Sequence, residues 1–224
     1  MKRSELNQIM TEALSFINEH RFCLPPFVTW TLEDWKTKNH EYDEIRDNML
    51  GWDITDFGSG DFRKCGLLLI TLRNGNFQNP KYLKLYAEKL MISEEGQVTP
   101  YHFHWKKMED IINRGGGTLV VKSYNSAPDG KVLDTPVTIY KDGRTYQVKA
   151  GEEVRIYNGE SITLMTGQYH TFWAEGGKCL VGEVSVMNDD NVDNRFLEPI
   201  GRFPAIEEDA PILYPLFSEI PKIR

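Results

Sequence analysis

Apolar residues near the start of the chain recur with the spacing of an α-helix. Between residues 3 and 20 a repeat of about 3.6 residues places them on one face: Leu6, Ile9, Met10, Ala13, Leu14, Phe16 and Ile17. Ser4 is predicted to be the N-cap, and Pro25 and Pro26 end the stretch because proline has no N–H to continue a helix. A second helix is predicted over residues 32–50, with Gly51 as its stop. Residues 1–60 are therefore expected to form a helical region.

From residue 61 onward the pattern changes to short strand-like runs. They cover residues 65–75, 82–93, 117–125, 135–151, 152–167 and 178–187. Dipeptides typical of tight turns punctuate them, with Asn-Gly at 74–75 and 158–159, Asp-Gly at 129–130 and 142–143, and Gly-Gly at 176–177. This pattern predicts a mainly β protein whose residues 61–198 form an antiparallel sandwich or barrel. The proline-dotted tail, residues 199–224, is expected to wrap on that body as an ordered arm, so the whole chain forms one structural domain.

Charge and cysteine content narrow the possible partners and surroundings. The chain has 26 basic and 33 acidic residues, a net charge of −7, and no basic cluster. Nucleic acid and anionic membranes are therefore not expected as partners. No apolar run reaches the roughly 18 residues of a membrane span, and the N-terminus lacks a signal-peptide core. Three widely spaced cysteines, Cys23, Cys65 and Cys179, suit a reducing compartment, and a cytoplasmic protein is predicted.

Two of the five histidines, His102 and His104, have a single residue between them. Residues two apart in a strand point to the same face, so both imidazoles can enter one small volume. Glu109 follows closely, and His170 lies in a separate run. Three nitrogens and one carboxylate would make a mixed site for a divalent ion such as manganese, iron, cobalt, nickel or zinc. The alternative is a pair of ordinary surface or core histidines, because short motifs also arise by chance.

The spacing around these histidines favours the metal site. Five residues separate Gly96 from His102, four separate His104 from Glu109, and six separate Glu109 from Gly116. A second segment runs from Gly159 through residues 165–167 to His170. Both segments resemble the two motifs of the cupin superfamily, although Met165 and Ala174 stand where cupins usually have proline and asparagine. The resemblance implies a cupin-type antiparallel jelly-roll β-barrel, with the ion held near its centre by His102, His104, Glu109 and His170.

Three longer stretches, residues 51–62, 88–117 and 181–196, resemble the D-lyxose isomerase family, and the likeness runs along nearly the whole chain. The resemblance implies a cytoplasmic, homodimeric cupin enzyme that prefers Mn²⁺, with Zn²⁺, Co²⁺, Fe²⁺ or Ni²⁺ as other possible ions. The implied reaction interconverts a free aldose and its ketose, D-lyxose with D-xylulose and also D-mannose with D-fructose. Such a reaction moves a proton between C1 and C2, and a divalent ion would act on it as a Lewis acid.

Proton transfer also requires a base and an acid. Glu183, which interrupts an apolar strand, is the first candidate for the base, and Glu109 is its rival. Lys107 could polarise the carbonyl or donate a proton. For both Glu183 and Lys107 the alternative is a solvated side chain that faces outward.

Candidate substrate-binding residues are Lys89, Asp193 and Arg195. Lys89 lies in an alternating strand and could face the pocket or the solvent. Asp193 and Arg195 are two residues apart, so they could bind sugar hydroxyls together or form an ion pair that pins the tail to the barrel.

Three other functions remain open on the sequence alone. A phosphosugar isomerase would need a cationic phosphate pocket, and only scattered lysines and arginines are available. A cupin dioxygenase would use iron and consume oxygen. A non-catalytic sugar-binding cupin would need neither Glu183 nor Lys107 as base or acid, so the presence of both candidates favours the isomerase.

Overall fold

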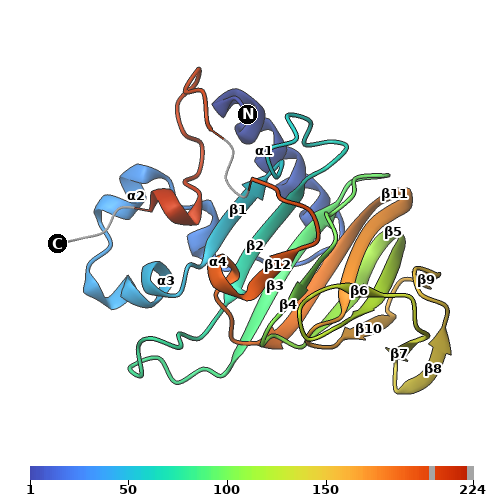
Figure 1. Ribbon diagram of the computed structural model, residues 1–224. Helices are drawn as coiled ribbons and strands as arrows, with labels where there is room; N and C mark the ends of the chain where they lie inside the picture. The colour runs from blue at the N-terminus through green and yellow to red at the C-terminus, as the bar shows by residue number, and fades with distance from the viewer. Residues whose placement is uncertain (202–204, 221–224) are drawn as a thin grey trace.

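A computed structural model of the chain, which describes residues 1–201 and 205–220, shows one helix of 17 residues and several short helices beside a large antiparallel β-structure (Figure 1). The helices are α1 (Arg3–Glu19), η1 (Pro26–Thr29), α2 (Leu32–Lys36), η2 (His40–Tyr42), α3 (Asp43–Asp47), α4 (Asp190–Asp193) and η3 (Phe217–Glu219). Among the described residues, no helix has the length and apolar character needed to cross a bilayer.

The strands form a 12-stranded antiparallel sheet. They are β1 (Gly51–Thr55), β2 (Leu67–Arg73), β3 (Tyr86–Ser93), β4 (His102–His104), β5 (Glu109–Ser126), β6 (Val132–Leu133), β7 (Val137–Lys141), β8 (Arg144–Val148), β9 (Glu153–Ile156), β10 (Ser161–Leu164), β11 (Tyr169–Val186) and β12 (Asn194–Phe196). The main path runs β1-β2-β3-β11-β5-β10-β7-β8, while β4 bridges β11 and β12. The predicted mainly β, cupin-type barrel with a helical N-terminal region is confirmed.

Two apolar cores lie on opposite faces of the same strands. Leu68, Ile70, Leu90 and Ile92 belong to the cluster that includes the buried face of α1. Their neighbours Leu69 and Met91, one position along β2 and β3, belong to the cluster inside the barrel. Successive side chains of a strand alternate between its faces, so both faces of β2 and β3 are buried. The position of a residue along these strands therefore decides whether it meets α1 or the barrel interior.

Several local predictions differ from the structure. The helix expected over residues 32–50 is replaced by α2, η2 and α3, because polar side chains bond to the nearby backbone: the Thr37 hydroxyl donates to the Asp34 carbonyl, and the Glu41 N–H donates to Asn39 Oδ1. β1 begins at Gly51, inside the region expected to be helical, and pairs with β2. The Gly-Gly pair at 176–177 lies within β11 at a register shift, not in a turn between strands.

The N-cap prediction was also wrong. Helix α1 begins at Arg3 with Lys2 as its N-cap residue. The hydroxyl of Ser4 instead donates to the Asp209 carboxylate at 2.7 Å, and the Ser4 N–H donates to the same carboxylate at 2.8 Å. These bonds join the first turn of α1 to the C-terminal segment. A fully buried Arg3 strengthens that junction, because its guanidinium pairs with Glu208 and Glu219.

Candidate metal centre and active site

Three of the predicted ligands, His102, His104 and His170, meet inside the barrel. His102 and His104 lie at the two ends of β4, and His102 pairs with His170 of β11. Each offers one ring nitrogen to a group in which the nitrogens lie within 4.8 Å of one another. All three side chains are buried, with exposed fractions of 8%, 4% and 1%. Strand pairing therefore converts the His-x-His spacing and a distant histidine into one compact set of nitrogens.

The hydrogen bonds of the three rings fix which nitrogen is available. Each Nδ1–H donates to a carbonyl oxygen: His102 to Pro100 at 2.8 Å, His170 to Gln168 at 3.0 Å, and His104 to Asn194 Oδ1 at 2.7 Å. A carbonyl oxygen can only accept, so the proton resides on Nδ1 and the lone pair on Nε2. Metal-binding histidines are commonly oriented in this way by their second nitrogen. Burial also lowers the pKa of His102 and His104, which favours the neutral form that binds metals.

Glu109, the fourth predicted ligand, opens β5 beside these nitrogens. Its Oε1 lies 3.3 Å from the Nε2 atoms of both His104 and His170. Neither Nε2 has a hydrogen-bond partner among the described residues. Two lone pairs that face a carboxylate oxygen in a buried site would be unfavourable alone, and a cation between them would satisfy all three atoms. The donor set thus fits a divalent metal ion.

A chain of ion pairs extends from Glu109 across the cavity. Lys107 Nζ lies 2.6 Å from Glu109 Oε2 and 3.0 Å from Glu183 Oε1. Lys89 Nζ lies 3.2 Å from the same Glu183 oxygen and 2.9 Å from Asp190 Oδ2. Lys89 and Glu183 are register partners on β3 and β11, and both are at most 4% exposed. Glu183, Lys107 and Lys89 therefore face the interior, whereas the sequence left their orientation open.

The charges in this chain stabilise one another. Burial alone would lower the pKa of the Lys107 ammonium, but the carboxylates of Glu109 and Glu183 hold that pKa well above its ordinary value. Burial alone would raise the pKa of the Glu109 carboxyl, but Lys107 and His104 hold it well below its usual range. Lys107 stays an ammonium and Glu109 stays a carboxylate at neutral pH, so a charged pair lies next to the three histidines.

Asp193 lies near the site, but it contacts the protein backbone. Its two carboxylate oxygens accept the N–H groups of Lys106 at 2.9 Å and of Lys107 at 3.0 Å. It is 6% exposed. Asp193 thus holds the segment that presents the Lys107 side chain. The part of the chain that the structure describes shows no ion pair between Asp193 and Arg195.

Arg195 is not brought together with the histidines. On β12 it is the register partner of Phe103, whereas Asn194 is the partner of His104. Its side chain is exposed and passes over Gly130, where a Cβ atom would lie 2.5 Å from Arg195 Nε. Since neighbours on a strand face opposite sides, Arg195 and the metal ligands lie on opposite faces.

Two residues of the site were not singled out from the sequence. Asn194 orients His104 through its amide oxygen, and Asp190 ends the chain of ion pairs at Lys89. Both belong to the stretch 181–196 that carries the family resemblance. The roles of Asn194 and Asp190 depend on the direction of their side chains. The segments α4 and β12 that carry them are too short to give a periodic sequence pattern from which that direction could be predicted.

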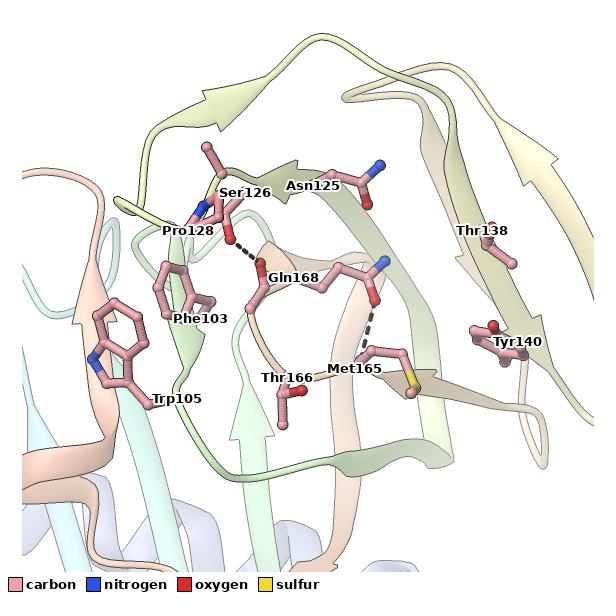
Figure 2. Close-up of a pocket in the computed structure, with 12 residues that line it drawn as sticks. Phe103, Trp105, Asn125, Ser126, Pro128, Thr138, Tyr140, Met165, Thr166 and Gln168 are labelled. Atoms are coloured by element: carbon pink, nitrogen blue, oxygen red, sulfur yellow. Dashed lines mark hydrogen bonds between the residues drawn. The ribbon is translucent and has the colours of Figure 1, made fainter.

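Three of the predicted metal ligands, His102, His104 and Glu109, line a small cavity of about 40 Å³ together with the residues of the ion pairs. The rest of its lining is mostly apolar and includes Leu69, Met91, Ile111 and Phe172, with Thr99 and Asn194 as polar members. Figure 2 shows a larger cleft of about 550 Å³. Phe103, between the two histidines in β4, helps to line it, and none of the described residues in its lining is charged. The smaller cavity is the candidate active site, because it alone of the two combines metal ligands with buried acids and bases.

Fold and site together define a cupin-type barrel with a buried set of donor atoms that fits a divalent metal ion. A model of the D-lyxose isomerase family matches residues 1–220. The chain belongs to this family and is a sugar isomerase.

Relatives with curated names agree with this assignment. The D-lyxose/D-mannose isomerase of Escherichia coli O157:H7 is 44% identical and covers 100% of both chains. The D-lyxose/D-mannose isomerase of Serratia proteamaculans is 47% identical and covers 94% of each.

Solved structures with the same fold include two L-ribose isomerases. The enzyme from Cellulomonas parahominis, without ligand, superposes with a TM-score of 0.62 at 18% identity. The enzyme from Geodermatophilus obscurus gives a TM-score of 0.60 at 14% identity. Each comparison covers 92% of this chain and 98% of the other. At these identities the likeness shows the fold alone.

Proposed function

We propose that the protein is a metal-dependent aldose–ketose isomerase that interconverts D-lyxose and D-xylulose, and also D-mannose and D-fructose. The observation that carries the proposal is the position of Glu183, a buried carboxylate held by two ammonium groups beside a set of metal ligands. The names of the relatives at 44% and 47% identity support the choice of sugars.

The residues that would hold the metal are His102, His104, Glu109 and His170. Three imidazoles and one carboxylate suit Mn²⁺, while Zn²⁺, Co²⁺, Fe²⁺ and Ni²⁺ accept the same donors. When bound, such an ion supplies a Lewis acid that lowers the energy of negative charge on the sugar oxygens.

Glu183 is the proposed base. It takes the C2 proton of the aldose and returns that proton to C1, and the reverse reaction uses the same two positions. Glu109, the rival base, is occupied on both oxygens, since Oε1 faces the histidines and Oε2 pairs with Lys107. Glu183 is not a metal ligand in this arrangement, and it remains available for proton transfer.

Lys107 and Lys89 hold Glu183 from two sides and fix the direction of its Oε1 atom. The Lys107 ammonium is the proposed hydrogen-bond donor to the sugar oxygen that exchanges between carbonyl and hydroxyl, and it polarises the carbonyl. Lys89 is proposed to bind a sugar hydroxyl. Asp193 is proposed to act through the backbone of Lys107. Arg195 stays a candidate for sugar binding only, and its outward position argues against that role.

The charges in the cavity favour a free sugar over a phosphorylated one. Lys89 and Lys107 face three carboxylates, those of Glu109, Glu183 and Asp190. A phosphate group would require cations that these acids already neutralise. A cytoplasmic location, a homodimeric assembly and the domain limits at residues 61 and 199 remain predictions.

The test is to remove bound metal with a chelator, restore Mn²⁺, and follow the conversion of D-lyxose to its ketose. The expected result is turnover that disappears with the metal and returns with Mn²⁺. A His170→Ala variant is the matched control and should not recover. Absence of metal-restored turnover on every free aldose would overturn the proposal, and oxygen uptake with iron would point to a dioxygenase.

A further inference from the structure

A second small cavity adjoins the candidate active site. It has a volume of about 20 Å³ and is called here the distal chamber. Its lining residues are Met49, Asp53, Thr71, Asn74, Lys89, Asn188, Asp190, Asn191 and Phe217. Lys89 and Asp190 also line the metal-site cavity. The ion pair between Lys89 Nζ and Asp190 Oδ2, 2.9 Å long, therefore stands at the boundary between the two cavities.

A sugar that reacts at the metal must place its remaining hydroxyls somewhere in this interior. One side of the metal-site cavity is apolar, with Leu69, Met91 and Phe172. Hydroxyls buried there would lose their hydrogen bonds to water without replacement. The side of Lys89 and Asp190 is rich in polar groups and continues into the distal chamber. A sugar chain that extends in that direction meets polar partners for its hydroxyls.

Asn188 supplies an independent indication that a ligand enters the chamber. It is 4% exposed, and its Oδ1 has no hydrogen-bond partner among the described residues. Its Nδ2 donates to Asp190 Oδ1, so turning the amide over would place two oxygens against each other. The orientation of the amide is thus fixed, and a buried acceptor is left for a donor such as a sugar hydroxyl.

The backbone of Asn188 is also held in place. Asn74 Nδ2 donates to the Asn188 carbonyl at 2.8 Å, and the Asn188 N–H donates to Asn74 Oδ1 at 3.2 Å. Asn74 is itself 3% exposed. The free acceptor of Asn188 is therefore presented by a rigid support, which is what a binding group requires.

Thr71 offers a second polar group in the chamber. It is the register partner of Lys89 on the neighbouring strand β2, and it is 6% exposed. Register partners project to the same face of a sheet, so Thr71 stands beside Lys89. No described residue forms a hydrogen bond with its hydroxyl, which leaves that group available to a ligand.

We infer that the distal chamber binds the end of the sugar chain farthest from the carbonyl, with Thr71 and Asn188 as hydrogen-bonding partners of its hydroxyls. This inference rests on the proposed isomerase function. On binding, sugar hydroxyls replace the direct contact between Lys89 and Asp190, and both side chains turn to the sugar. Thr71 and Asn188 then determine the affinity for the polyol chain, whereas Glu183 and the proposed metal ligands carry out the chemistry.

The test uses metal-restored protein and two sugar alcohols, D-arabinitol and D-mannitol, which have no carbonyl and cannot isomerise. Calorimetry gives their Kd for wild type, Thr71→Val, Asn188→Ala and the control Thr138→Val, whose threonine lines the separate large cleft. Loss of one hydrogen bond should weaken binding roughly three- to tenfold in Thr71→Val or in Asn188→Ala, and not in the control. The KM for D-lyxose should rise in parallel, with kcat changed less.

Unchanged Kd values in both chamber variants, with D-lyxose turnover intact, would overturn the inference while leaving the proposed function standing. Absence of turnover in the wild type would instead overturn the proposed function. If Asn188→Ala fails to fold, Thr71→Val decides alone, because valine matches the shape of threonine and removes a hydroxyl without a protein partner.

Discussion

Replacing Glu183 by glutamine separates the base from every other part of the site. The substitution keeps the shape of the side chain, and the amide oxygen can still accept from Lys89 and Lys107, which lie 3.2 and 3.0 Å from Oε1. It removes the negative charge and the ability to take up a proton. The predicted metal ligands keep their positions, because Glu183 contacts Lys107 and it is Lys107 that pairs with Glu109.

The expected magnitudes follow from these contacts. Loss of a positioned base lowers a rate by about 10²–10⁴-fold, which corresponds to roughly 3–5 kcal/mol of barrier height. The ion pairs of Glu183 with Lys107 and Lys89 become contacts between a charged ammonium and a neutral amide, at a cost of about 1 kcal/mol each in unfolding free energy. Lys89 keeps Asp190 and Lys107 keeps Glu109 as partners, so neither ammonium is left unpaired.

The assay compares kcat for D-lyxose, bound metal per chain and the thermal midpoint. Glu88→Gln is the matched control, because Glu88 lies one residue from Lys89 on β3 and pairs instead with Arg73. Glu183→Gln should lose at least about a hundredfold in kcat with full metal content, and Glu88→Gln should lose little. A Glu183→Gln enzyme that retains kcat within about tenfold would refute the assignment of the base and move it to Glu109.

Three further substitutions probe the surroundings of the site. Asn194→Ala removes the acceptor that orients His104 and should weaken metal affinity about 10–100-fold, as measured by competition with a chelator; unchanged affinity would contradict the role of Asn194. Arg195→Ala should leave kcat/KM for D-lyxose within about twofold, because the Arg195 side chain lies on the face of β12 opposite to the histidines. A larger loss would show that Arg195 does contribute to sugar binding. Arg3→Ala should lower the unfolding free energy by about 2 kcal/mol without changing kcat, because it removes the ion pairs that join α1 to Glu208 and Glu219. An unchanged melting curve would show that these ion pairs add no stability.

The clustering of the predicted ligands could be anticipated from the sequence because it depends on two local features. Alternation in a strand places His102 and His104 on one face, and the motif spacing adds Glu109 and His170. The strand pairing of His102 with His170 then completes the cluster. The barrel was predictable for a similar reason, because the Asp-Gly pair at 142–143 makes the β7–β8 turn with positive φ at both residues.

Orientation and long-range pairing could not be predicted in the same way. Whether Glu183 faces inward depends on the register of β11 with β3 and β5, which is set by the whole barrel. Asp190 meets Lys89 across a separation of 101 residues. Asp193 and Arg195 were expected either to bind sugar hydroxyls together or to form an ion pair, but Asp193 ends α4 and accepts from the Lys107 backbone, whereas Arg195 lies on β12 opposite Phe103. These features follow from tertiary contacts that no local pattern encodes.

One divalent ion in the histidine cluster is expected to enable sugar isomerisation. The most direct measurement is a titration of chelator-stripped protein with Mn²⁺, in which bound metal and D-lyxose turnover are followed together. Turnover should rise in proportion to bound Mn²⁺ and reach its plateau at one ion per chain. Full turnover in the stripped protein, or one tightly bound ion per chain with no turnover, would contradict the account.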